Sequence, residues 1–211
     1  MKKIIPLSAP ILFLTLGFFL IGQAPPKSLM DQWKDVELEI KKGLPKTAIE
    51  KIDPLIKRAL KHESHAVAIR AIGQKINLEG AIEGNKAEEK IARMEEEIAK
   101  APEALKPMMR AVLSNWYWQY FQQNRWRFSQ RTRTAEAPGE DITTWDLSRI
   151  LLEIDKQFQK TLSYHEVLKK QAIGDYDFLL KKGNVPESYR PTLYDFVVHD
   201  ALRFYSAGEQ A

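Results

Sequence analysis

The chain has 211 residues and a formal net charge of +4, from 32 lysines and arginines against 28 aspartates and glutamates. Two of the basic residues, Lys2 and Lys3, lie at the extreme N-terminus, so the rest of the chain is close to neutral and its charge does not favour nucleic-acid binding. The chain has no cysteine, which excludes disulfides, thiolate catalysis and cysteine-bound metal.

The N-terminal segment 1–24 has the layout of a secretory signal peptide. Two lysines precede an apolar stretch at residues 4–21, and a small-residue exit follows it. Two prolines interrupt the stretch and leave its unbroken part near the lower limit for crossing a membrane, which favours a cleaved signal over an anchor. Cleavage after Ala24 would place Pro25 at the new N-terminus, which signal peptidases disfavour. The alternative is therefore an uncleaved membrane anchor at residues 4–21.

The signal sequence predicts a periplasmic or extracellular protein that contacts a membrane only if this segment stays uncleaved. Residues 25–211 are enough for one domain with its own core, and a hydrophobic content of 44% supports folding. We expect a single helical domain over 25–211 that relies on core packing, because an exported chain without cysteine has no disulfides.

The chain after the signal sequence predicts four amphipathic helices in succession. Their apolar positions recur every three to four residues, and in chain order they are Leu29, Trp33, Val36 and Ile40; Ile49, Ile52, Ile56, Ala59 and Leu60; Ala66, Ile69, Ile72 and Ile76; and Ala87, Ile91, Met94 and Ile98. Gly43 and Pro45 should end the first helix, and Pro54 should kink the second or reset its start. Gly80 and Gly84 should break the chain after the third.

A fifth helix has the strongest pattern, with apolar residues at Leu105, Met108, Met109, Val112, Leu113, Trp116, Tyr120 and Phe121. The polar stretch from Gln122 to Asp141 should be a long loop. A sixth helix should follow with Thr143 or Thr144 as its cap. Shorter helices are expected at 167–173 and near 176–180, and a last helix should begin at Pro191.

No stretch alternates between polar and apolar residues with period two, so the sequence predicts an all-α fold. The hairpin around Leu44–Ala48 joins two amphipathic helices and is similar to tetratricopeptide-type helical pairs. A strict internal repeat does not emerge, which favours an irregular bundle of about seven to eight helices over a regular solenoid.

The sequence gives no sign of catalysis, a cofactor or a metal site. Of the histidines, only His62 and His65 are close in sequence, and zinc needs three or four converging ligands. The chain has no Gly-x-Ser-x-Gly motif, and we predict that it is not an enzyme. An enzyme of unrecognised type would need a pocket that joins the residues of one C-terminal cluster. That cluster consists of Tyr189, Asp195, His199 and Arg203, whose helical spacing favours an ordinary surface network.

Basic and aromatic residues alternate between Asn124 and Arg133, and the neighbouring helix carries aromatic rings on more than one face. In a cytoplasmic protein such a stretch could bind nucleic acid, but the expected export argues against that interpretation. The rings could instead anchor a loop to the bundle while the arginines meet carboxylates, or they could form a partner-binding surface. The candidate partner-binding residues are Trp118, Arg125, Trp126, Arg127, Phe128 and Arg131.

Three blocks of residues go beyond a generic helical pattern. They are Trp33–Val36 followed by Gly43–Ile49; Trp118 and Tyr120 followed by Asn124–Trp126, Arg131–Thr132 and Asp141–Trp145; and Tyr189–Phe196 followed by His199 and Ala201–Leu202. In this order and spacing, the blocks resemble the N-terminal helical region of large bacterial alpha-2-macroglobulin-like proteins, from about Leu29 to Tyr205.

The resemblance implies an exported helical module from the N-terminal region of a protease-trapping protein. Members of that family trap proteases with macroglobulin β-domains, a bait region and often a thioester. This chain lacks the cysteine that a thioester needs, so the resemblance transfers no functional residue to it. The expected role is docking or positioning without catalysis, with a protein as the partner: the downstream macroglobulin domains or an envelope protein.

The alternative function is a stand-alone tetratricopeptide-like periplasmic adaptor. Its hairpins between Trp33 and Ile76 would hold a peptide or protein partner in a concave groove. A regular superhelix of helix pairs with a polar inner face would favour the adaptor, whereas a closed globule would not.

Overall fold

The computed structural model describes residues 27–131, 139, 141–181 and 183–208, and this part of the chain is all-α, as predicted. It contains eight α-helices: α1 (Leu29–Lys41), α2 (Pro45–Lys61), α3 (His65–Ile82), α4 (Ala87–Lys100), α5 (Lys106–Ser129), α6 (Leu147–Leu162), α7 (His165–Leu168) and α8 (Leu193–Tyr205). Three short 3-10 helices are η1 (Ile142–Thr144), η2 (Ile173–Tyr176) and η3 (Glu187–Tyr189). The predicted signal peptide or anchor lies outside the described residues.

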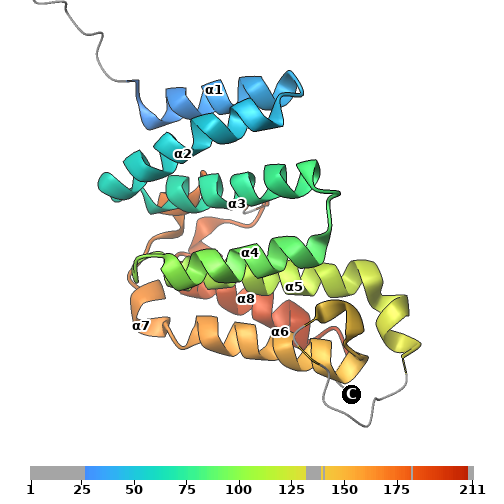
Figure 1. Ribbon diagram of the computed structural model, residues 1–211. Helices are drawn as coiled ribbons and strands as arrows, with labels where there is room; N and C mark the ends of the chain where they lie inside the picture. Colours follow the sequence, from blue (N-terminus) through green and yellow to red (C-terminus); the bar gives the residue numbers. More distant parts are fainter. Residues whose placement is uncertain (1–26, 132–138, 140, 182, 209–211) are drawn as a thin grey trace, which may run out of the picture.

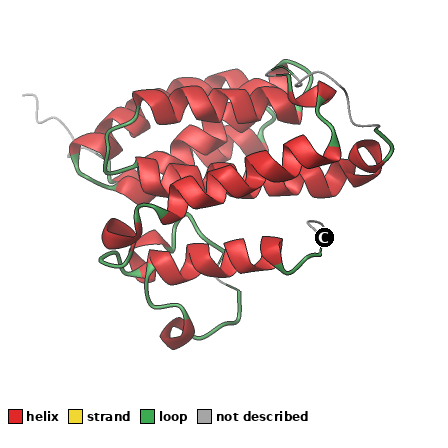
Figure 2. Ribbon diagram, turned by 90° about the horizontal axis from the view of Figure 1, so that it is seen from below, coloured by secondary structure: helices red, strands yellow, loops and turns green. Residues whose placement is uncertain are grey.

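The helices from α1 to α6 are stacked in chain order. Figure 1 shows α1 and α2 at the top, α3 beneath them, then α4 and α5, with α6 below. Each of these helices packs chiefly on its neighbours in sequence, and turns of only a few residues make the first hairpins antiparallel. Figure 2 shows that the C-terminal helix lies along one side of this body. The fold is an irregular helical bundle with tetratricopeptide-like hairpins at its N-terminal end.

The two halves of the stack have different cores. The core between α1, α2 and α3 is built from small and aliphatic side chains such as Ala48, Ile52 and Ala68, all fully buried. The core between α5, α6 and α8 is aromatic: the ring of Phe204 lies 5.6 Å from that of Phe158 and 5.1 Å from that of Trp118. Small side chains let helices approach closely, whereas the aromatic half packs large rings against one another.

Two expected helix breaks do not occur. Helix α2 begins at Pro45 and runs through Pro54, which is solvent-exposed, so the expected reset at Pro54 is wrong. Proline costs the helix one hydrogen bond, and the buried apolar face of α2 outweighs that loss. Gly80 lies inside α3 against Lys90 of α4, and the chain turns only at Gly84, whose φ is +105°. Gly84 adopts the left-handed conformation that glycine tolerates best.

The expected long loop from Gln122 to Asp141 is wrong over its first part, because α5 continues to Ser129. The helix is kinked at Asn124, whose φ of −115° and ψ of 15° are not helical. The side-chain amide of Asn124 donates a hydrogen bond of 2.9 Å to the carbonyl oxygen of Tyr120. Beyond the kink, the next turn buries Phe128 completely, which supplies the packing energy that keeps these polar residues helical.

Several helix starts differ from expectation. Asp146, rather than Thr143 or Thr144, caps α6 by accepting a hydrogen bond of 2.8 Å from the backbone N–H of Arg149. The last helix begins at Leu193 instead of Pro191, because Thr192 and Asp195 form a reciprocal capping box. The short helices expected at 167–173 and near 176–180 are wrong in their bounds, because this region contains only the single turns α7 (His165–Leu168) and η2 (Ile173–Tyr176).

A C-terminal strap, defined as residues 171–192, lies against α1 and α3. Backbone hydrogen bonds close it at its base, between Ile173 and Pro191 (3.0 Å) and between Leu193 and Gln171 (3.0 Å). The ring of Phe178 in the strap meets the Trp33 ring edge-on at 5.3 Å. The chain itself therefore covers this face of the N-terminal hairpins, as in a closed globule.

Arg70 of α3 holds the strap in place. Its guanidinium lies over the rings of Trp33 (4.5 Å) and Phe178 (4.1 Å). It also donates a hydrogen bond of 2.7 Å to the backbone carbonyl of Phe178. Cation–π contacts and a charge-assisted hydrogen bond thus fix the strap at one point.

Candidate functional site: a groove between α2, α3 and α4

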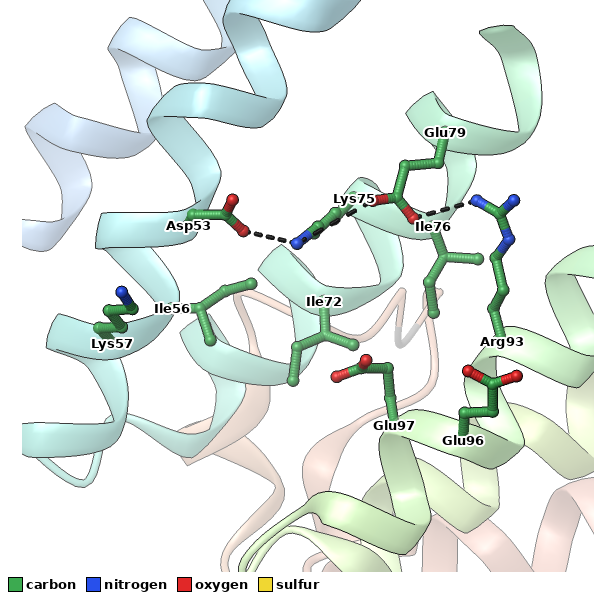
Figure 3. A pocket seen from close by; sticks show the side chains of 10 residues that line it. All are labelled: Asp53, Ile56, Lys57, Ile72, Lys75, Ile76, Glu79, Arg93, Glu96 and Glu97. Atoms are coloured by element: carbon green, nitrogen blue, oxygen red, sulfur yellow. Dashed lines mark hydrogen bonds and ion pairs between the residues drawn. The ribbon is translucent and has the colours of Figure 1, made fainter. Parts of the chain in front are cut away.

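A groove of about 540 Å³ opens between α2, α3 and α4 (Figure 3). It is lined by Asp53, Ile56 and Lys57 from α2, by Ile72, Lys75, Ile76 and Glu79 from α3, and by Arg93, Glu96 and Glu97 from α4. On each helix these residues are spaced three or four positions apart, so each helix contributes one stripe of its surface. Ile56 of α2 and the two isoleucines of α3 form an apolar floor, and the charged side chains of α2 and α4 form the walls.

Ion pairs cross part of the groove and join its three helices. The Lys75 ammonium donates to Asp53 of α2 at 2.6 Å and lies 3.9 Å from Glu79. Arg93 of α4 pairs with Glu79 at 3.1 Å and also with Glu83. The hydrogen bond to Asp53 raises the pKa of the Lys75 ammonium above its usual value, so this lysine stays charged at neutral pH.

The rest of the groove combines an apolar floor with charges that are not neutralised within it. Ile56 is half-buried, and Ile72 is buried but lines the cavity. Within the described part of the chain, Lys57 forms no ion pair, and Glu96 and Glu97 pair with Lys100, at 3.8 and 3.9 Å. Figure 3 accordingly draws interactions among Asp53, Lys75, Glu79 and Arg93 but none to these three residues. The charge of Glu97 also contributes to the raised pKa of Lys75.

The basic–aromatic segment, defined as residues 124–131, contains most of the sequence-predicted partner-binding residues. Phe128 is fully buried, and the guanidinium of Arg127 lies over its ring at 5.3 Å and donates to the Tyr120 hydroxyl. Arg131 donates a hydrogen bond of 2.9 Å to the backbone carbonyl of Trp145. These side chains hold the end of α5 against the bundle.

The other predicted partner-binding residues differ in their exposure. Trp118 lies outside the segment and is half-buried between Phe121 and Phe204. Arg125 and Trp126 are exposed, and 67% of the Trp126 surface is accessible. The structure therefore leaves Trp126 as the only large apolar side chain that the segment exposes.

The residues of the enzyme alternative lie in different surroundings within the described part of the chain. Asp195 is engaged in the capping box of α8, and Tyr189 is 73% exposed. A cavity of about 470 Å³ includes Arg203, but with Asp200, Trp118, Phe158 and three amide side chains instead of His199. Burial raises the pKa of the Asp200 carboxyl, and the Arg203 guanidinium lies 3.9 Å from it.

Two features are absent from the residues that the structure describes. No three histidine, aspartate or glutamate side chains of that part gather in a way that could hold a metal ion. Among its helices, none is long and apolar enough to cross a membrane.

Comparison with known proteins returned no match to a protein-family model, to a curated protein or to a solved structure. The resemblance to alpha-2-macroglobulin-like proteins therefore stays a prediction. The proposed function is therefore based on the geometry of the groove.

The groove is not predicted from the sequence, although the helices that line it are. Ile72 and Ile76 were expected in the core and the charged faces of α4 in solvent, and both expectations hold for much of each helix. The available signal was that isoleucine and charged residues share the same stripe on consecutive helices. The sequence alone did not say that these stripes face one another.

Proposed function

We propose that the protein is a non-catalytic docking module that binds a segment of a protein partner in the groove between α2, α3 and α4. The observation that supports this function is an isoleucine floor, half-buried at Ile56, that is bordered by charged walls. Protein interfaces commonly have this anatomy, with an apolar centre and a polar rim.

The lining favours a protein segment over a small molecule. Seven of the ten lining residues are charged and three are isoleucines. Small-molecule sites are mostly apolar and aromatic, with a few polar groups that converge on the ligand. Long charged side chains on open walls suit a partner that brings its own charged and apolar side chains.

The family resemblance names the partners to test first. An exported module of an alpha-2-macroglobulin-like protein would dock the macroglobulin domains or an envelope protein. The adaptor alternative is the same docking activity with a peptide partner, and its expected hairpins include the groove residues Asp53 to Ile76. The face that carries Trp33 and Arg70 is covered by the strap, so the groove is the open docking surface of these hairpins.

A displayed peptide library tests the proposal. The library is selected on the wild-type protein alone, and the selected peptides are then measured on Ile56→Glu, which places a charge on the groove floor. The matched control is Leu38→Glu, because Leu38 is 49% exposed on α1, away from the groove. Circular dichroism verifies that both variants fold.

We expect selected peptides to bind the wild type and Leu38→Glu alike and to lose more than about tenfold in affinity on Ile56→Glu. Equal binding to all three proteins, or no enriched peptide, would contradict docking in the groove.

A further inference from the structure

The two walls of the groove carry opposite charges. Among the charged residues that line the groove, α2 contributes Asp53 and Lys57, and α4 contributes Arg93, Glu96 and Glu97. Within the groove, Lys57 supplies the positive charge of the α2 wall, and Glu96 and Glu97 supply the negative charge of the α4 wall. These charges remain after the internal ion pairs have formed, because Asp53 is paired with Lys75 and Glu79 with Arg93.

The groove also restricts the backbone of its occupant. Its walls and floor are helices, whose backbone N–H and C=O groups are bonded within the helices themselves. An extended segment would therefore bury its own backbone groups without partners, which is costly. A helical segment satisfies its backbone internally and presents apolar residues at i, i+3, i+4 and i+7 as one stripe.

We infer that the groove binds an amphipathic helix of a partner protein, whose apolar stripe is flanked by acidic residues on one side and basic residues on the other. The acidic flank faces Lys57 and the basic flank faces Glu96 and Glu97, while the stripe covers Ile56 and Ile72. This inference rests on the proposed function and specifies the chemistry of the partner. A helix with two flanks of the same charge would place like charges against one wall.

Three synthetic peptides test the inference. Each has about 18 residues, long enough to form a helix, and the same leucine stripe. Their flanks are mixed (glutamate on one side, lysine on the other), all glutamate or all lysine. Binding of each peptide is measured by calorimetry at low salt against the wild type, against Lys57→Glu and against the double variant Glu96→Lys with Glu97→Lys.

We expect the wild type to prefer the mixed peptide by about tenfold, because each flank then meets a wall of opposite charge. Lys57→Glu makes both walls acidic and should prefer the all-lysine peptide. The double variant makes both walls basic and should prefer the all-glutamate peptide. All preferences should shrink as salt increases, since these charges are exposed to solvent.

Two controls separate a failure of this inference from a failure of the proposed function. Lys41→Glu reverses an exposed charge on α1, outside the groove, and should leave the peptide preference unchanged. Ile56→Glu tests whether any peptide that binds occupies the groove.

If all peptides bind the wild type equally and Ile56→Glu abolishes binding, docking stands and the charge inference is overturned. If no peptide binds, or if binding survives Ile56→Glu, docking of a helix in the groove is itself overturned.

Discussion

The groove and the basic–aromatic segment both combine charged side chains with large apolar ones, yet they differ in what those side chains already contact. In the segment, Arg127, Phe128 and Arg131 are engaged by the bundle. In the groove, Ile56 stays accessible and Lys57 has no ion-pair partner in the described part of the chain. The amino-acid composition of a segment does not by itself identify a binding surface. A binding surface needs side chains that the rest of the fold leaves accessible and without an internal partner.

The largest expected effect on stability distinguishes a buried ring from an exposed ring in the basic–aromatic segment. Phe128→Ala removes a fully buried ring and should lower the free energy of unfolding by about 3–5 kcal/mol. Trp126→Ala removes a ring that is 67% exposed and should change it by less than about 0.5 kcal/mol. Urea denaturation of the two variants measures the difference. Similar losses for both would show that the segment is not anchored by Phe128.

A second prediction compares how much the two faces of α3 contribute to stability. Arg70→Ala removes the contacts with Trp33 and Phe178 and the hydrogen bond to the strap, and it should cost about 2 kcal/mol. Lys75→Ala on the groove side removes a solvent-screened ion pair and should cost less than about 1 kcal/mol. Thermal unfolding compares them, and protease cleavage within the strap should increase only for Arg70→Ala. A larger loss for Lys75→Ala would contradict this ranking of the two faces.

The first four helices could be predicted from the sequence because their apolar residues repeat at helical spacing and pack on the next helix in the chain. Ile52, Ile69 and Met94 were expected to be buried, and they are. The end of α5 could not be predicted in this way. Phe128 packs on Tyr120 and Phe121 across the kink at Asn124, and the surrounding glutamines, arginines and asparagine give no local signal for a helix.

The candidate site was harder to predict than the fold for a related reason. An exposed arginine and an arginine that donates to a backbone carbonyl, such as Arg131, look identical in a sequence. The groove depends on how α2 and α4 are placed across α3, and this placement is a property of the packed structure.

A third prediction concerns the buried carboxylate of Glu153 in the aromatic half of the stack, whose contribution to stability depends on pH. Burial alone would raise the pKa of the Glu153 carboxyl, but hydrogen bonds from Lys156 (3.1 Å) and Gln157 (2.7 Å) lower it overall. A lowered pKa stabilises the fold above the unfolded value near 4.3, and this stabilisation is lost as the pH falls through the folded value.

Glu153→Gln should therefore cost about 1 kcal/mol at neutral pH, allowing for solvent screening of its partners. The difference from the wild type should shrink as the pH falls below about 4. Urea denaturation over a series of pH values measures this change, and Glu96→Gln on the exposed face of α4 is the matched control. A difference that stays constant at every pH would contradict the pairing of Glu153.

The smallest effect on stability belongs to the charges of the groove. Lys57→Glu, Glu96→Lys and Glu97→Lys should each change the free energy of unfolding by less than about 0.5 kcal/mol, because these side chains are solvated and weakly paired. Thermal unfolding at two salt concentrations checks this. A loss of several kcal/mol would assign these charges to the fold and remove them from the docking surface.

The most direct test of the docking assignment compares one peptide on two variants. The affinity of a library-selected peptide is measured for Ile56→Glu in the groove and for Trp126→Ala in the basic–aromatic segment. If the groove is the docking surface, Ile56→Glu loses more than about tenfold in affinity and Trp126→Ala stays within about twofold of the wild type. The reverse result, with binding lost on Trp126→Ala and kept on Ile56→Glu, would contradict the account and place docking at Trp126.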